Sequence, residues 1–229
     1  MVPDDARRDR LERMARIVLR PIGSPLPLGM IALAAGSIVL TGLQLRWVPV
    51  SSAHQVALVV LVFTVPMQVL GSVFGFLARD GAGGTGLATL AGTWAVTGVL
   101  MATAPPGSRS PVLGLLLCVA AAAVLVPATA AAFGKVAIGL AFAMAAARFA
   151  VTGVYQLHGG VAWRSASGWL GLALCIVALY CAFAAEVEDT RHRTTLPLLR
   201  HGAGRAAMDG SVLDDLNDVE RDAGVRGQL

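Results

Sequence analysis

The sequence predicts an all-α, polytopic membrane protein with six transmembrane helices, and two observations lead to this prediction. Of the 229 residues, 56% are hydrophobic and only 14% are charged, whereas a soluble domain has about half apolar and a quarter charged residues. The charged residues lie mainly at the two ends of the chain, so long apolar stretches remain between them. A water-soluble single domain is therefore excluded.

Six stretches of the chain are apolar and close to the ~20 residues that a helix needs to cross a hydrocarbon core of about 30 Å. In chain order they cover residues 28–45, 53–78, 85–102, 111–132, 136–155 and 168–185. The segments between them are short and contain charged residues, glycine or proline, which is typical of turns. These turns cover residues 46–49, 79–84, 105–111, 133–135 and 158–167.

Two prolines fall inside the predicted helices, Pro66 in the second and Pro127 in the fourth. Each removes one helix hydrogen bond and favours a bend. Gly71 and Gly75 follow Pro66 at the spacing that lets membrane helices approach closely. We therefore expect a bent second helix with close neighbours.

The ends of the chain differ from its body, and the sequence predicts three parts. Residues 1–24 form a cytoplasmic amphipathic segment that carries opposite charges at i,i+4 spacing. Residues 25–197 form the six-helix transmembrane domain. Residues 198–229 form a polar, disordered cytoplasmic tail with one transient helix.

The orientation follows from the basic residues near the ends of the spans. Six spans put both termini on one side, where eleven Arg and Lys residues lie, against three on the other side. The eleven are Arg7, Arg8, Arg10, Arg13, Arg16, Arg20, Arg79, Lys135, Arg191, Arg193 and Arg200, and the three are Arg46, Arg109 and Arg164. By the positive-inside rule, both termini are cytoplasmic.

The membrane-embedded body has a surplus of positive charge. Between residues 21 and 185 the only acidic residue is Asp80, against six Arg and Lys residues. A path through such a body favours anions over cations.

Residues 81–86, Gly-Ala-Gly-Gly-Thr-Gly, match the GxGxxG pattern of dinucleotide-binding turns. That pattern needs a preceding β-strand, whereas here it joins two predicted spans, so turn flexibility and close helix approach explain the glycines better. The sequence contains no nucleophile–base set and no spaced pair of metal ligands. We expect no enzymatic activity, no cofactor, no metal site and no nucleic-acid partner.

Polar side chains recur at i,i+4 spacing and line one face of several predicted spans. They are Ser37, Thr41 and Gln44 after Leu33, then Thr64, Gln68 and Ser72, then Thr85, Thr89, Thr93 and Thr97, and finally Arg148 and Thr152 after Met144. The alternative is that the hydroxyl groups bond back to their own helix. For the four threonines and for Gln68 we favour the lining of an interior path.

Among the residues of the predicted spans, Arg148 has the highest free-energy cost of insertion into the membrane, because it is charged and is flanked by alanines and Phe149. A guanidinium near the bilayer centre costs about 2.5 kcal/mol or several times more. Two interpretations remain open: Arg148 faces water, a partner or an anion inside the bundle, or it extends toward the outer interface.

Three groups of residues resemble the acetate uptake transporter family, whose bacterial members are the succinate-acetate permeases. Residues 25–30, Pro-Leu-Pro-Leu-Gly-Met, resemble the signature that opens the family's first helix, with Pro25, Pro27 and Gly29 in the corresponding places. Residues 68–94 align without gaps with the second and third helices, where Gln68, Gly83, Thr85 and Trp94 match. The segments 168–171 and 193–197, with Tyr180 between them, resemble the last helix and its exit.

The resemblance implies a six-helix protomer that assembles into a homohexamer, with a separate route in each protomer for acetate, succinate or a similar carboxylate. The family narrows this route with three apolar side chains, which correspond here to Leu33, Leu90 and Ala143. The chain departs from the family pattern at five positions, where the family residue is given in parentheses: Ser24 (Asn), Gly75 (Glu), Asp80 (Asn), Leu90 (Tyr) and Ala143 (Leu). The changes at 90 and 143 favour a wider constriction.

These observations together predict a permease or channel for small carboxylate anions in the bacterial cytoplasmic membrane, in contact with lipid. The predicted path residues are Leu33, Ser37, Thr41, Gln68, Thr85, Thr89, Leu90, Thr93, Ala143 and Arg148. No carboxylate lies within the spans, so we expect no proton relay through Asp or Glu. The alternative is a non-conducting scaffold or sensor that retains the family fold and binds a partner through its tail.

Overall fold

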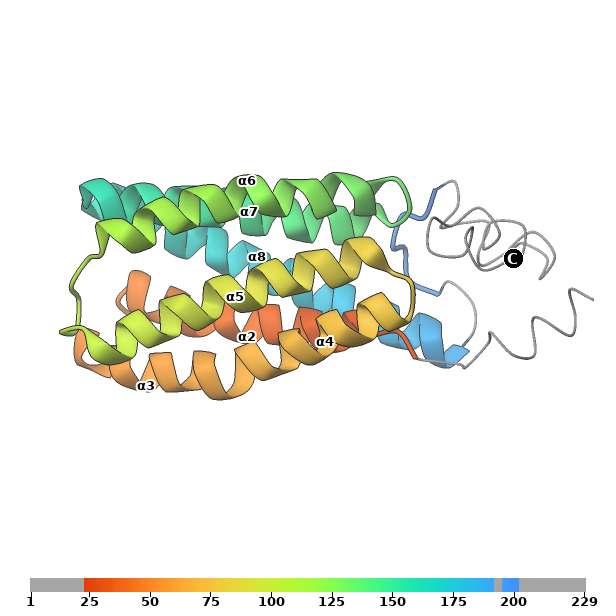
Figure 1. Ribbon diagram of the computed structural model, residues 1–229, viewed down its shortest axis with the longest axis horizontal. Helices are drawn as coiled ribbons and strands as arrows, with labels where there is room; N and C mark the ends of the chain where they lie inside the picture. The colour runs from red at the N-terminus through yellow and green to blue at the C-terminus, as the bar shows by residue number, and fades with distance from the viewer. Residues whose placement is uncertain (1–22, 192–194, 202–229) are drawn as a thin grey trace, which may run out of the picture.

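The computed structural model describes residues 23–191 and 195–201, and these residues form a bundle of helices (Figure 1). In chain order the elements are α2 (Leu26–Gln44), the 3₁₀ turn η1 (Val50–Ser52), α3 (Ala53–Val59), the π-helical segment η2 (Val60–Thr64), α4 (Val65–Leu77), α5 (Gly81–Thr103), α6 (Pro111–Ala132), α7 (Val136–His158) and α8 (Val161–Arg191). Six helical units are long and apolar enough to cross a membrane, with η1, α3, η2 and α4 forming one of them. No strand occurs in the described ranges. The six predicted spans and the all-α class are confirmed.

The helix boundaries differ from the sequence prediction at two turns. α5 begins at Gly81 and not at Thr85, because the Asp80 carboxylate caps the helix by accepting a hydrogen bond from the Gly83 amide at 2.8 Å. α8 begins at Val161, seven residues before the predicted start. The interpretation of residues 81–86 as a flexible turn is therefore wrong, since they form the first turns of α5.

Close approach of helices, the other explanation offered for the glycines, is confirmed. A Cβ added to Gly84 would lie 3.0 Å from the Phe76 ring, and one added to Gly75 would lie 3.0 Å from the Gly84 backbone. The absence of side chains at these two positions lets α4 and α5 pack directly against each other. α6 packs against α7 in the same way, where a Cβ on Gly114 would lie 3.0 Å from the Gly153 carbonyl oxygen.

The second span is irregular at the position of Pro66. The π-helical segment η2 ends at Thr64 and α4 begins at the next residue, so Pro66 lies in the first turn of α4. Since proline has no amide hydrogen, one helix hydrogen bond is lost at Pro66, and the widened turn lies next to this loss. Figure 1 shows a change of direction between α3 and α4. Pro127, in contrast, lies inside the continuous helix α6.

Residues 195–201 form a strap that covers the start of α7. The amides of Val136 and Ala137 donate to the carbonyl oxygens of Leu199 and Leu198 at 3.3 and 3.2 Å, and the Leu198 side chain is fully buried. The first four residues of the predicted tail, 198–201, thus pack on the bundle. The rest of that tail, residues 202–229, lies outside the described residues, as do residues 1–22 of the predicted amphipathic segment.

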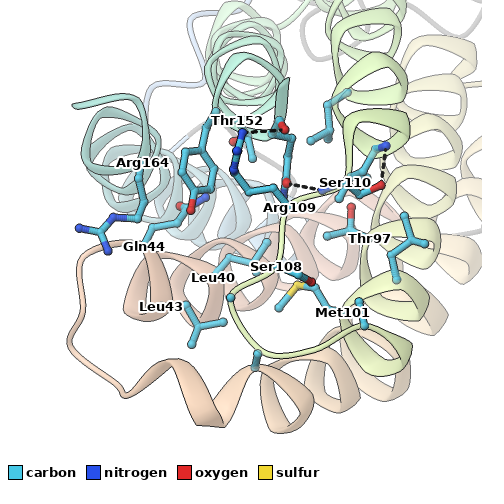
Figure 2. A pocket seen from close by; sticks show the side chains of 18 of the residues that line it. Leu40, Leu43, Gln44, Thr97, Met101, Ser108, Arg109, Ser110, Thr152 and Arg164 are labelled. Carbon is cyan, nitrogen blue, oxygen red and sulfur yellow. Dashed lines mark hydrogen bonds between the residues drawn. The ribbon is translucent and has the colours of Figure 1, made fainter. Parts of the chain in front are cut away.

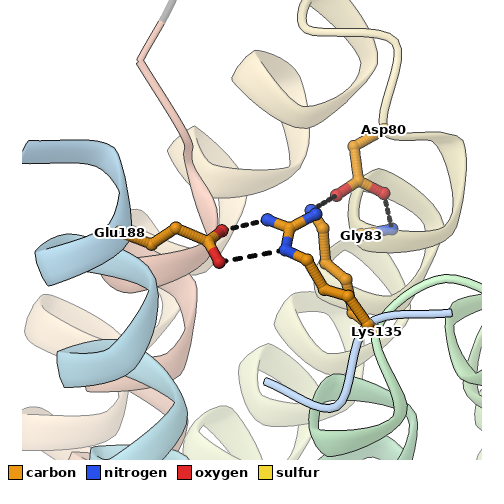
Figure 3. Close-up of polar contacts among 5 residues, drawn as sticks. Asp80, Gly83, Lys135 and Glu188 are labelled. Atoms are coloured by element: carbon orange, nitrogen blue, oxygen red, sulfur yellow. Dashed lines mark hydrogen bonds and ion pairs between the residues drawn. The ribbon is translucent and has the colours of Figure 1, made fainter. Parts of the chain in front are cut away.

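Two ion pairs lie beside the strap (Figure 3). Arg200 of the strap pairs with Glu188 of α8, and Lys135 pairs with Asp80 at 3.5 Å. Asp80 therefore has two roles, since it also caps α5. These contacts close the end of the bundle from which α2 begins.

Candidate functional site

A cavity of about 290 Å³ lies at the end of the bundle opposite the strap (Figure 2). We call this end the mouth end; it is formed by residues 45–50, 104–110 and 159–160. The cavity walls come from α2, α5, α6, α7 and the start of α8 together with the loop between α5 and α6. Leucines and Phe149 make up much of the wall, and polar side chains such as Thr97, Thr152 and Gln156 interrupt it.

The charge of the cavity wall is entirely positive. Among the described residues that line it are four arginines, at positions 46, 109, 148 and 164, and no aspartate or glutamate. Arg109 lies at the mouth, where its Nη1 donates to the carbonyl oxygens of Gln156 and Leu157 at 3.5 and 3.3 Å. In Figure 2 the Arg164 side chain points away from the other labelled residues. Such a wall attracts small anions.

Arg148 forms the floor of the cavity. It lies ten residues before the end of α7, or about 15 Å along the helix axis at 1.5 Å per residue, which is about half the thickness of the hydrocarbon core. Its side chain is only 2% exposed. The structure therefore places the guanidinium inside the bundle and not at the outer interface.

The guanidinium is only partly satisfied by hydrogen bonds. Nη2 donates to the Ser37 carbonyl oxygen at 3.1 Å and to Oε1 of Gln44 at 3.4 Å, and Cζ lies 5.8 Å from the centre of the Trp94 ring. Nη1 has no partner among the described residues. A buried cation with an unused donor is a site at which an anion can bind.

Gln44 holds Arg148 in place at the floor. The sequence placed Gln44 in a polar stripe but did not predict this role. While its Oε1 accepts from Arg148, its Nε2 donates to Ser167 Oγ at 2.8 Å, and Ser167 contacts Thr152 Oγ1 at 2.5 Å. One turn away, Thr41 Oγ1 donates to the Gly168 carbonyl oxygen at 3.2 Å. These bonds tie α2, α7 and α8 together around the guanidinium.

The three apolar residues that the resemblance associates with a constriction lie beyond the floor. Leu33 precedes Ser37 by one turn, Leu90 precedes Trp94 by one turn, and Ala143 precedes Arg148. Leu33 and Leu90 are fully buried in the apolar core, against which the partly buried Ala143 packs. The cavity therefore ends where these residues begin.

Several buried polar atoms beside the floor have no hydrogen-bond partner among the described residues. They are Ser37 Oγ, Thr64 Oγ1, Trp94 Nε1 and both amide atoms of Gln68. Gly36 brings two of them close together, because a Cβ at that position would lie 3.0 Å from Thr64 Oγ1 and 3.4 Å from Trp94 Cζ2. Leaving a polar group buried and unpaired costs about 1–3 kcal/mol, so these groups are available to bind water or a polar ligand.

The threonines of α5 behave differently. Thr89, Thr93 and Thr97 each donate to the carbonyl oxygen four residues earlier, at 2.8–2.9 Å. Of the predicted stripe only Thr97 lines the cavity, while Thr85 is exposed and Thr89 is half-buried. The bonding pattern is the one expected of hydroxyl groups that serve their own helix.

The signature residues at the start of α2 lie far from the cavity. Pro25 is the N-cap residue and Pro27 lies in the first turn, where a missing amide hydrogen costs nothing. Gly29 packs against the Leu87 side chain of α5. Of the predicted path and signature residues, only Trp94 and Arg148 line the cavity. Thr97 and Gln44 of the predicted polar stripes also line it, as does Phe149, which the sequence did not single out.

Comparison with known proteins gives a match at the level of structure. No protein-family model matches the chain, and no curated protein does. A solved structure described as the bacterial acetate channel SatP has the same fold, with a TM-score of 0.67 and 19% identical residues. The alignment covers 76% of this chain and 98% of that one. No group of three or more His, Cys, Asp or Glu side chains that could hold a metal ion occurs in the described part of the chain.

Proposed function

We propose that this protein is a permease or channel that carries small carboxylate anions, such as acetate or succinate, across the bacterial cytoplasmic membrane. The observation that carries the proposal is the cavity that leads from the mouth end to a buried, partly unsatisfied arginine, with four arginines and no acidic residue among its described lining. The fold shared with the structure described as the bacterial acetate channel SatP supports it, as do the residues that resemble the motifs of the acetate uptake transporter family.

The proposed route has three parts. Arg46 and Arg109 attract the anion to the mouth, and Arg148 receives it at the floor. The unpartnered groups of Ser37 and Gln68 then replace part of its hydration shell. Leu33, Leu90 and Ala143, which lie beyond the floor, form the proposed gate; the two leucines are fully buried.

The proposed assembly is a homohexamer in lipid, with one route in each protomer. The cytoplasm faces the strap, and the mouth faces the outside, as the distribution of basic residues predicts. Since no acidic residue of the described ranges lines the cavity, we expect no proton relay through Asp or Glu, and any pH dependence reflects protonation of the substrate.

Flux measurements on reconstituted protein test the proposal. Proteoliposomes are loaded with buffer and exposed to radiolabelled acetate, propionate, lactate or succinate, with empty vesicles as the control. We expect uptake of at least one carboxylate at ten times the rate in empty vesicles or more. Rates equal to those of empty vesicles for all four compounds would reject the proposal.

One observation favours a second candidate, a non-conducting scaffold or sensor: Leu33 and Leu90, which lie beyond Arg148, are fully buried in the apolar core. Truncation after His201 separates the two candidates, because it spares the strap and removes only residues 202–229. A truncated permease conducts as before, whereas a truncated scaffold loses its partner and no version of it conducts.

A further inference from the structure

The floor of the cavity has the composition of a binding site for one carboxylate group. We propose that Arg148 and Trp94 bind the carboxylate of a short-chain monocarboxylate at this floor, in preference to a dicarboxylate. The ligand class in this inference rests on the proposed function. The inference adds a specific site, a stoichiometry of one carboxylate per site and a preference for monocarboxylates over dicarboxylates.

Among the described residues, no acidic side chain forms an ion pair with Arg148. The ion pairs of Asp80 with Lys135 and of Glu188 with Arg200 lie beside the strap, at the opposite end of the bundle from Arg148. The groups that do contact the guanidinium are neutral: a backbone carbonyl, an amide oxygen and an indole ring. A buried charge without a partner is strongly unfavourable, so a bound anion stabilises this arrangement.

The unused donors at the floor match what a carboxylate needs. Nη1 of Arg148 and Nε1 of Trp94 are both buried and without a partner among the described residues. Both groups can only donate hydrogen bonds, and a carboxylate can only accept them. Ser37 adds a third unpartnered group next to them, since its carbonyl oxygen already contacts Arg148 while its hydroxyl group has no partner.

The wall above the floor explains the preference for one carboxylate. One helical turn closer to the mouth, the hydroxyl groups of Thr97 and Thr152 donate to backbone carbonyl oxygens at 2.8 and 2.7 Å. The neighbouring wall is apolar, with Leu113 and Phe149. An alkyl tail of two or three carbons fits this environment, whereas the hydroxyl groups of Thr97 and Thr152 already bond to their own helices and are not free to donate to a second carboxylate beside them.

Gln44→Glu tests the site with almost no change in shape. A carboxylate at this position lies where Oε1 already accepts from Arg148, so it supplies the missing counter-charge internally and competes with the ligand. Gln156→Glu is the matched control: it adds the same charge to the cavity wall near the mouth, where Oε1 accepts from the Ser110 amide at 3.0 Å, a bond that glutamate retains.

Binding is measured on the purified full-length protein in detergent by saturation-transfer NMR titration with butyrate. We expect Gln44→Glu to weaken butyrate binding at least thirtyfold and Gln156→Glu to weaken it less than fivefold. Unchanged binding in Gln44→Glu overturns the proposal. Equal losses in the two variants also overturn it, because they indicate attraction by the whole cavity and not a site at Arg148.

Arg148→Met provides an independent test that does not add a charge. The methionine keeps the apolar part of the side chain and removes all the donors, so butyrate binding should disappear. The melting temperature without ligand, followed by circular dichroism, should equal or exceed that of the wild type, because an unpaired buried charge has been removed. Butyrate binding that survives in a folded Arg148→Met protein overturns the proposal.

Succinate in the same titration tests the selectivity, and we expect it to bind at least tenfold more weakly than butyrate. Equal binding of the two overturns the preference for monocarboxylates. The assay needs no transport, so its result is separate from the flux measurement. Butyrate binding without flux supports the site and rejects the permease. Flux that is insensitive to Gln44→Glu supports the permease and rejects the site.

Discussion

Gly171 makes the space that Arg148 occupies. A Cβ at this position would lie 2.7 Å from Cζ and 2.8 Å from Nε of Arg148, and it would also meet Thr41 Oγ1. Contacts under 3.0 Å cannot be kept, so a side chain here displaces the guanidinium or separates α8 from α2 and α7. The glycine is thus part of the site, although it offers no functional group.

We predict that Gly171→Ala destabilises the protein by about 1–3 kcal/mol, the usual cost of overpacking a well-packed core. It should also weaken butyrate binding, because Arg148 moves. Chemical denaturation in detergent, followed by circular dichroism, measures the first effect.

Gly81→Ala is the control for that prediction. Nothing lies within 4 Å of a Cβ at Gly81, in the first turn of α5. Alanine in a helix is better than glycine by up to about 1 kcal/mol, so this variant should be neutral or slightly more stable. A Gly171→Ala protein as stable as Gly81→Ala would show that the packing around Arg148 is loose.

At the scale of elements, the π-helical segment η2 decides which side chains of the second span face the interior. Thr64 ends this segment and is fully buried against Gly36, and Gln68 follows one turn later in α4. A wider turn shifts the register of all later residues relative to a regular helix. The inward position of Gln68 therefore depends on the irregularity next to Pro66.

The strap depends on the ion pair between Arg200 and Glu188, whose side chains are only 13% and 6% exposed. We predict that Glu188→Gln loosens the strap from α7, because neutralising one member of a buried pair is strongly destabilising. Hydrogen exchange of the Val136 and Ala137 amides, which donate to the strap, should accelerate at least tenfold, equivalent to ~1.4 kcal/mol.

Glu186→Gln is the matched control for the strap, since Glu186 lies on the same helix two residues earlier and its side chain is exposed. Its exchange rates should equal those of the wild type. Equal rates in Glu188→Gln as well would mean that backbone hydrogen bonds and the buried Leu198 hold the strap without the ion pair.

At the scale of the whole molecule, the charge distribution predicts the orientation in the membrane. Ser108 lies exposed in the loop at the mouth, and Asp189 lies exposed near the end of α8 beside the strap. In intact spheroplasts, a membrane-impermeant maleimide should label Ser108→Cys but not Asp189→Cys, and permeabilisation should expose both. The wild type is the background control, because its cysteines at 118, 175 and 181 are buried or half-buried. The reverse labelling pattern would contradict the proposed orientation.

The six spans, the surplus of positive charge in the membrane-embedded body and the presence of one arginine deep within a span follow from the amino-acid sequence alone. These properties depend on composition within windows of about 20 residues, so they can be read without knowing which helices are neighbours. Even the early start of α5 has a local cause, the cap by Asp80.

The direction in which Arg148 points, and the groups that surround it, depend on how the helices pack. Its bond to Ser37 joins residues 111 positions apart, and the bond between Gln44 and Ser167 that supports it spans 123 positions. The packing of the helices likewise decides whether a threonine hydroxyl bonds to its own helix or lines a cavity. It also decides whether residues 198–201 leave the bundle or cover α7. Such contacts follow from the shape of whole helix faces, and no local pattern in the chain encodes them.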